Sequence, residues 1–170
     1  MKNDEKPLAL QQLKSLRDSP IAEVKRLYLI ARATSEEASW YALAAVDGRE
    51  DPGYCCKLFR DLVLQKGKDA VQQFVCGQWS NLSEGQRRNI CYCVFDPQSI
   101  STEFAEQLFY LDGSNTHERH LICAGLASSM SRRSDVKPTL KRLIEKIGAY
   151  ENPQRQNRLD RFISNVKNNL

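Results

Sequence analysis

The sequence predicts an all-α protein built from antiparallel helical hairpins, and the stretch between residues 40 and 64 supplies the two observations behind this prediction. First, apolar residues recur there in adjacent pairs with charged residues between them, which is the spacing of a helix that buries one face. These apolar residues are Tyr54, Cys55, Leu58, Phe59, Leu62 and Val63. Second, Asp51 is suited to cap that helix and Pro52 to occupy its first turn, while Gly48 suits the end of the preceding helix.

Three helices are expected before this turn and two directly after it. Residues 7–18 and 21–33 form the first two, because Ser19-Pro20 supplies a stop and a start between two helical patterns. A third helix follows Ser35, which can cap it, and continues to Asp47. After the turn, Gly67 ends the fourth helix and residues 68–79 form the fifth.

The next segment opens a helix at residues 81–84, and its apolar body, residues 90–95, fits two structures. Six apolar residues with β-branched and aromatic members satisfy both a buried strand and a buried helix. Because the surrounding segments are helical, we predict a helix here as well.

The turn between two helices recurs twice in the second half of the chain. Asp96-Pro97 stands where Asp51-Pro52 stood, and the apolar stripe after it consists of Ile100, Phe104, Leu108 and Leu111. A looser third copy spans residues 120–148, with Pro138 in the first turn of its second helix. The stripe of that helix is Val136, Leu140, Leu143, Ile144 and Ile147. Residues 153–168 form a last helix that buries Leu159, Phe162, Ile163 and Val166 and has a polar outer face.

This pattern resembles the helical hairpin of HEAT-type repeats, in which a small apolar helix, an Asp-Pro turn and a second amphipathic helix form the repeating unit. The resemblance covers about two thirds of the chain and lies in the repeat patterning. It implies a right-handed α-solenoid of stacked antiparallel hairpins with about nine or ten helices. The alternative is an irregular helical bundle.

Length and composition favour one domain over residues 1–170, with 41% hydrophobic and 27% charged residues. The sequence contains no apolar run of the ~20 residues that a membrane span needs, and the first residues do not form a secretory signal. We therefore expect a cytoplasmic protein that does not enter a membrane. The six cysteines lie among apolar residues of predicted helices, which favours buried free thiols over disulfides.

His117, His120 and Cys123 follow each other at three-residue steps on one predicted helix, so a metal site can be drawn there. The apolar neighbours of Cys123 favour a metal-free core instead. The same segment is a poor site for a nucleophile, because the backbone N–H groups of a helix are already bonded and cannot form an oxyanion hole. We therefore expect no cofactor and no enzymatic activity.

The positive charge lies at the C-terminal end, where residues 132–170 carry ten basic and four acidic side chains. A set of these residues is a candidate phosphate-binding face for nucleic acid. It consists of Arg132, Arg133, Lys137, Lys141, Arg142, Arg155, Arg158 and Arg161. The alternative is a solvated charged surface.

Four aromatic residues are candidate anchors for a partner protein, with burial in the core as the alternative. They are Trp40, Tyr41, Trp79 and Tyr110. The function that the sequence favours is a protein–protein interaction module or adaptor, with a partner that can be acidic. Nucleic-acid binding through the basic C-terminal third is the second hypothesis.

Overall fold

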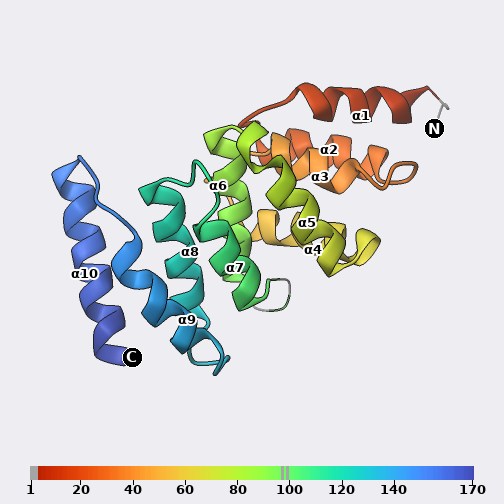
Figure 1. The fold of residues 1–170 in the computed structure, drawn as a ribbon. Coiled ribbons are helices and arrows are strands. Elements are labelled where there is room, and N and C mark those ends of the chain that lie inside the picture. The colour runs from red at the N-terminus through yellow and green to blue at the C-terminus, as the bar shows by residue number, and fades with distance from the viewer. Residues whose placement is uncertain (1–3, 97, 99) are drawn as a thin grey trace. The chain divides into compact units, whose positions relative to one another are not determined.

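The computed structural model describes residues 4–96, 98 and 100–170 of the chain, and Figure 1 shows its fold. All regular secondary structure in these residues is helical, apart from one isolated bridge between Ser19 and Val46. The described part holds ten α-helices, which confirms the predicted all-α class and helix number. The α-helices are α1 (Glu5–Ser15), α2 (Ile21–Ala31), α3 (Ala38–Ala45), α4 (Pro52–Lys66), α5 (Lys68–Gln78), α6 (Glu84–Tyr92), α7 (Thr102–Phe109), α8 (Thr116–Ser128), α9 (Val136–Leu143) and α10 (Pro153–Asn169). Short 3-10 helices cover Trp79–Asn81, Cys93–Phe95 and Ile144–Lys146.

The described residues fall into two compact units, one ending at Cys93 and the other beginning at Val94. The single domain expected over residues 1–170 stays a prediction. None of the helices in the described ranges is both long enough and apolar enough to cross a membrane.

In the first unit, α2 and α3 lie between α1 and α4 (Figure 1). Their core is continuous because each helix buries one apolar face, as the sequence pattern predicts. The fully buried side chains at its centre include Leu13, Leu27, Tyr28, Leu43, Leu58, Phe59 and Leu62.

The turn before α4 has the predicted chemistry. The side chain of Asp51 accepts a hydrogen bond from the backbone N–H of Gly53 at 3.0 Å, and Pro52 is the first helical residue. Gly67 ends α4 with φ +85°, a conformation that glycine adopts without strain. The sequence therefore specifies both ends of this helix.

The predicted role of Gly48 as the end of the preceding helix is wrong. Helix α3 already ends at Ala45, and Gly48 lies where a Cβ atom would stand 2.3 Å from Oδ1 of Asn89. A close approach between the α3–α4 connection and α6 therefore requires this glycine.

The segment 90–95 is helical, as predicted, although α6 gives way to the 3-10 turn Cys93–Phe95. The second copy of the Asp-Pro turn differs from the first. Helix α7 begins only at Thr102, and its cap is Ser101, whose hydroxyl accepts a hydrogen bond from the N–H of Phe104 at 3.1 Å. Pro97 lies outside the described residues, whereas Asp96 accepts from the N–H of Gln98 at 3.1 Å.

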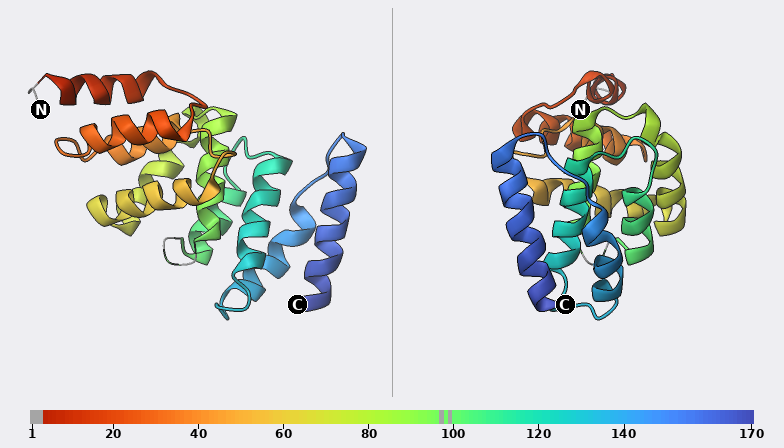
Figure 2. Two further views of the ribbon diagram at one scale, coloured as in Figure 1. Left: turned by 180° about the vertical axis from the view of Figure 1, so that it is seen from behind. Right: turned by 60° about the vertical axis from the view of Figure 1, so that its left-hand side comes forward.

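In the second unit, α8 packs against α7 and α9, and the two views of Figure 2 show α10 along the side of α8 and α9. Gly125 allows the close packing of α8, because a Cβ atom there would lie 3.0 Å from Val94. Helix α10 buries Leu159 and Val166, as predicted, while Phe162 and Ile163 are only half-buried. The Phe162 ring lies against the ring of His120 on α8, with centroids 5.1 Å apart.

Candidate functional site

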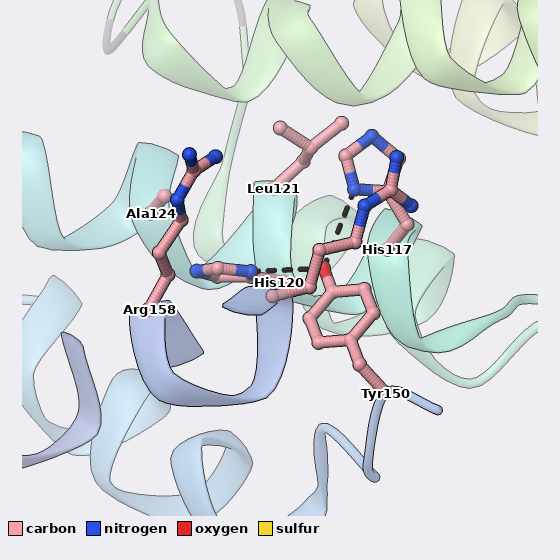
Figure 3. Close-up of a pocket in the computed structure, with 7 residues that line it drawn as sticks. His117, His120, Leu121, Ala124, Tyr150 and Arg158 are labelled. Atoms are coloured by element: carbon pink, nitrogen blue, oxygen red, sulfur yellow. Dashed lines mark hydrogen bonds between the residues drawn. The ribbon is translucent and has the colours of Figure 1, made fainter. Parts of the chain in front are cut away.

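A pocket of about 220 Å³ lies in the second unit between α8 and α10 (Figure 3). Helix α8 contributes two histidines and two apolar residues, α10 contributes two arginines, and the segment before α10 contributes a tyrosine. The lining residues are His117, His120, Leu121, Ala124, Tyr150, Arg155 and Arg158. The sequence pattern places the histidines and the arginines in different hypotheses, and it does not indicate Tyr150.

Helical spacing explains why these side chains converge. Residues three, four and seven positions apart share one face of a helix, and His117, His120, Leu121 and Ala124 have this spacing on α8. Arg155 and Arg158 are likewise three positions apart in the first turns of α10. In the view of Figure 3, Arg158 extends beside Ala124, on the opposite side of His120 from His117.

Tyr150 is held in place by the turn that precedes α10. Its backbone N–H donates to Oε1 of Gln156 at 2.7 Å, and the hydroxyl of Thr116 donates to the carbonyl oxygen of Ala149 at 3.3 Å. Gly148 has φ +100°, and a Cβ atom on it would lie 2.8 Å from Oγ1 of Thr116. The turn therefore ties Tyr150 to the first residue of α8.

The hydroxyl of Tyr150 joins the two histidines (Figure 3). It lies 2.9 Å from Nδ1 of His120 and 3.3 Å from Nδ1 of His117. A phenol carries one proton, so it donates to one imidazole and accepts from the other. The three side chains therefore form one hydrogen-bonded group with coupled proton positions.

Burial governs the charges of this group. It lowers the pKa of His120 below its ordinary value, and the positive charge of His117 lowers it further. Burial raises the pKa of the Tyr150 phenol, while the charge of Arg155 opposes that shift. At neutral pH, His120 and Tyr150 are therefore uncharged, and the two arginines carry positive charge beside them.

The metal set suggested by the sequence is not assembled. Cys123 is fully buried, and burial raises the pKa of its thiol to about 12, so it is not available as a thiolate ligand. In the described residues, no three side chains of His, Cys, Asp or Glu lie close enough to hold a metal ion. The two histidines contact Tyr150 instead.

The structure divides the basic residues that were predicted to form one face. Arg133 pairs with Asp135 at 2.6 Å and donates to the carbonyl oxygen of Ile100 at 2.9 Å. Arg142 makes two hydrogen bonds to Glu106, at 3.2 and 2.9 Å. These two guanidinium groups are therefore already engaged by the chain itself.

The other basic candidates are exposed. Arg155 and Arg158 line the pocket, and the guanidinium of Arg161 donates to the backbone oxygen of Asn157 at 3.4 Å. Arg132, Lys137 and Lys141 are exposed and lie outside the pocket.

The four aromatic candidates also lie in different surroundings. Trp79 is 1% exposed and belongs to the core of the first unit. Tyr110, in the second unit, is 49% exposed, with the Lys146 ammonium 5.7 Å from its ring centroid. Tyr41 is half-buried, with the Lys14 ammonium 4.8 Å from its ring.

Trp40 is half-buried and belongs to an apolar surface of the first unit. Its ring meets Phe74 edge-on, with centroids 4.9 Å apart, and Phe74 is 37% exposed. Leu64 is 79% exposed and lines a neighbouring pocket of about 330 Å³ with Tyr28, Arg32, Ala33, Asp61 and Gln65. The predicted helical spacing placed Phe74 with the core residue Val71, so the sequence did not reveal this surface.

No protein-family model matches this chain, and neither does a curated protein or a solved structure. Two surfaces of the described residues are candidates for function, the apolar one in the first unit and the arginine and histidine pocket in the second.

Proposed function

We propose that this protein is a non-catalytic interaction module that holds another protein on the apolar surface of its first unit. We call this surface the apolar patch and define it by Trp40, Leu64 and Phe74. We further propose that the helices act as stacked hairpins of the HEAT-like solenoid type, a fold class whose members present grooves to partners. Successive contacts of α2 with α3 and of α3 with α4 support this arrangement within the first unit.

The observation that carries the proposal is the exposure of Leu64. At 79% exposed, it is the most exposed of the large hydrophobic residues in the described part of the chain. Soluble proteins tolerate single exposed leucines, but contiguous apolar patches mark interaction sites. Leu64 lies near the end of α4, and Trp40, which contacts Phe74, lies in the first turn of α3. Figure 1 shows the α2–α3 connection and the α4–α5 turn at the same end of the unit. The hydrogen bond from Ser39 to Gln65, 3.0 Å long, fixes this junction.

The rim of the patch favours an acidic partner. The Lys66 ammonium lies 5.7 Å from the Phe74 ring centroid, and the Arg32 guanidinium lies 6.0 Å from the Tyr28 ring centroid. Asp61 is the acidic residue that lines the neighbouring pocket, and it is paired with Lys57 at 3.6 Å. A partner segment with apolar anchors and acidic flanks would therefore complement this surface.

A binding comparison between matched variants tests the proposal. Immobilised wild-type protein and the double variant Leu64→Ser, Phe74→Ser are exposed to a cell lysate, and retained proteins are quantified by mass spectrometry. Leu8→Ser is the control, because Leu8 is 53% exposed and lies on α1, which carries none of the three patch residues. We expect at least one protein to be retained by wild type and control and reduced about tenfold or more by the double variant, since buried apolar anchors dominate interface energies.

Equal retention by all three proteins would contradict the assignment of the patch. If the Leu8→Ser control lost the partner to the same extent as the double variant, the apolarity of the surface in general would determine retention, and the patch would not. Unfolding midpoints of the variants establish that they remain folded, which exposed positions favour.

Nucleic-acid binding by the basic C-terminal third is the second candidate function. The observation that favours it is that Arg132, Lys137 and Lys141 are exposed and, among the described residues, make no ion pair with a carboxylate. Against it stands the internal pairing of Arg133 and Arg142, which interrupts the proposed face.

A further inference from the structure

We infer that the pocket formed by His117, His120, Tyr150, Arg155 and Arg158 is a binding site for the phosphoryl group of a compact phosphate monoester. This site lies in the second unit and does not depend on the apolar patch or on the partner proposed for it. The inference rests on the sign of the charge, the number of hydrogen-bond donors and the volume of the pocket.

The charge of the lining selects an anion. Two guanidinium groups line the pocket, and no carboxylate does. Within the described part of the chain, neither Arg155 nor Arg158 forms an ion pair with an acidic residue, so both can serve a ligand. A bound cation would lie beside two positive charges without compensation, whereas an anion would be attracted by both.

The donors suit a phosphoryl group better than a carboxylate. Each guanidinium presents up to five N–H donors in a planar fork that matches two oxygens of one phosphate. A phosphate monoester offers three terminal oxygens with about two negative charges at neutral pH, so it can use both arginines together. A carboxylate carries one negative charge on two oxygens, so it gains less than a phosphoryl group from a second arginine. The imidazole whose Nδ1 accepts the Tyr150 proton carries its own proton on Nε2, so this ring offers one further donor.

The volume limits what the phosphoryl group can carry. The pocket has a volume of about 220 Å³. It lies below the range of roughly 300–1,000 Å³ that is typical for cofactor-sized ligands. Leu121 and Ala124 form an apolar wall beside the charged groups. The pocket therefore suits a phosphoryl group with a small, partly apolar alcohol portion, and it is too small to enclose a whole nucleotide.

The histidines provide a direct readout of binding. The chain contains two histidines, and both line this pocket. Their ring signals in heteronuclear NMR spectra therefore report on the site without interference from other histidines. The titrations use O-phospho-L-serine, phenyl phosphate, inorganic phosphate and acetate at neutral pH, with chloride holding the ionic strength constant.

We expect saturable shifts of both histidine signals with the two esters and at least tenfold weaker binding of acetate. Tighter binding of phenyl phosphate than of O-phospho-L-serine would show that the alcohol portion contacts the apolar wall. Tighter binding of O-phospho-L-serine would indicate that the ligand is a phosphorylated amino-acid side chain. If inorganic phosphate binds at least as tightly as both esters, the pocket is not a monoester site.

Matched arginine variants complete the test. Arg158→Gln and Arg155→Gln each remove a charged donor and are expected to weaken ester binding by about tenfold or more. Arg132→Gln removes an exposed arginine of the same unit outside the pocket and should leave the affinity unchanged. Both pocket arginines are exposed, so the variants should keep the unfolding midpoint of the wild type. Absent histidine shifts, equal affinity for acetate, or unchanged affinity in both pocket variants would overturn the assignment.

Discussion

Asn89 is the residue whose side chain holds the end of α3 against α6. Its Nδ2 group donates to the carbonyl oxygens of Leu43 at 2.9 Å and Val46 at 2.7 Å, and its Oδ1 atom accepts from the N–H of Gly48 at 3.1 Å. The carbonyls at a helix end have no partner within the helix, so a buried helix end needs such a side chain. Asn89 is buried and satisfies three backbone groups at once.

Asn89→Ala is therefore expected to destabilise the protein by about 3–5 kcal/mol, because each buried backbone group left without a partner costs roughly 1–3 kcal/mol. Urea unfolding monitored by circular dichroism measures this loss. Asn81→Ala, at an exposed asparagine of the same unit, is the control and should change stability by less than about 0.5 kcal/mol. A loss below about 1 kcal/mol for Asn89→Ala would mean that water replaces the side chain.

The individual residues of the candidate site were predictable only in part. His117 and His120 could be paired from sequence because a three-residue step places them on one helical face. Tyr150 belongs to the same hydrogen-bonded group but lies about thirty residues further along the chain, after a turn that no local pattern specifies. The contact between Tyr150 and the histidines depends on how α10 packs beside α8, and the local sequence does not specify that tertiary packing.

Helix α4 shows how much a local cap contributes to an element. Asp51 accepts from the N–H of Gly53, one of the N-terminal groups that has no partner within the helix. Helix α7 uses Ser101 in the same way, and α6 uses the reciprocal pair of Ser83 and Gln86.

Asp51→Ala is expected to lower the free energy of unfolding by about 0.5–2 kcal/mol, because it removes this cap. Asp51→Ser keeps an oxygen that can accept the same bond and should restore most of the stability. Chemical unfolding of the three proteins under one condition measures the difference. If the serine variant were as unstable as the alanine variant, capping would not be the role of Asp51.

The elements were largely predictable because their end signals are local. Asp51, Pro52 and Gly67 specify α4 without reference to any other helix. Asp96 resembles Asp51 in sequence, but α7 begins beyond it at the serine cap, so an Asp-Pro pair alone does not fix a helix start. The role of Gly48 was not predictable, because a glycine is needed there to make room for the distant Asn89, and sequence spacing does not show that contact.

For the whole molecule, charge is distributed unevenly along the chain. The formal net charge is +4, and residues 132–170 carry ten basic and four acidic side chains. The pairing of Arg133 with Asp135 and of Arg142 with Glu106 holds the pKa of each carboxyl below its usual range through the arginine hydrogen bonds. Part of the basic excess is therefore neutralised locally, which favours the protein-binding proposal over a phosphate track.

The salt dependence of nucleic-acid binding tests this balance. Suppose that about four basic residues, Arg132, Lys137, Lys141 and Arg158, contacted phosphates. Affinity for duplex DNA would then fall roughly a hundredfold between about 50 and 200 mM salt. We therefore expect only weak binding that disappears at physiological salt, measured by fluorescence anisotropy with labelled duplex DNA, single-stranded DNA and RNA.

The decisive comparison uses two charge-matched double variants. Arg158→Glu with Arg161→Glu alters α10, and Lys25→Glu with Arg26→Glu makes the same change in charge on exposed positions of α2. If the proposed function is right, both variants weaken the low-salt binding to a similar extent, because only net charge attracts the nucleic acid. Binding that survives physiological salt and is lost only in the α10 variant would instead make nucleic acid the main partner. Net charge changes equally in the two variants, so such a difference would require site-specific phosphate contacts on α10.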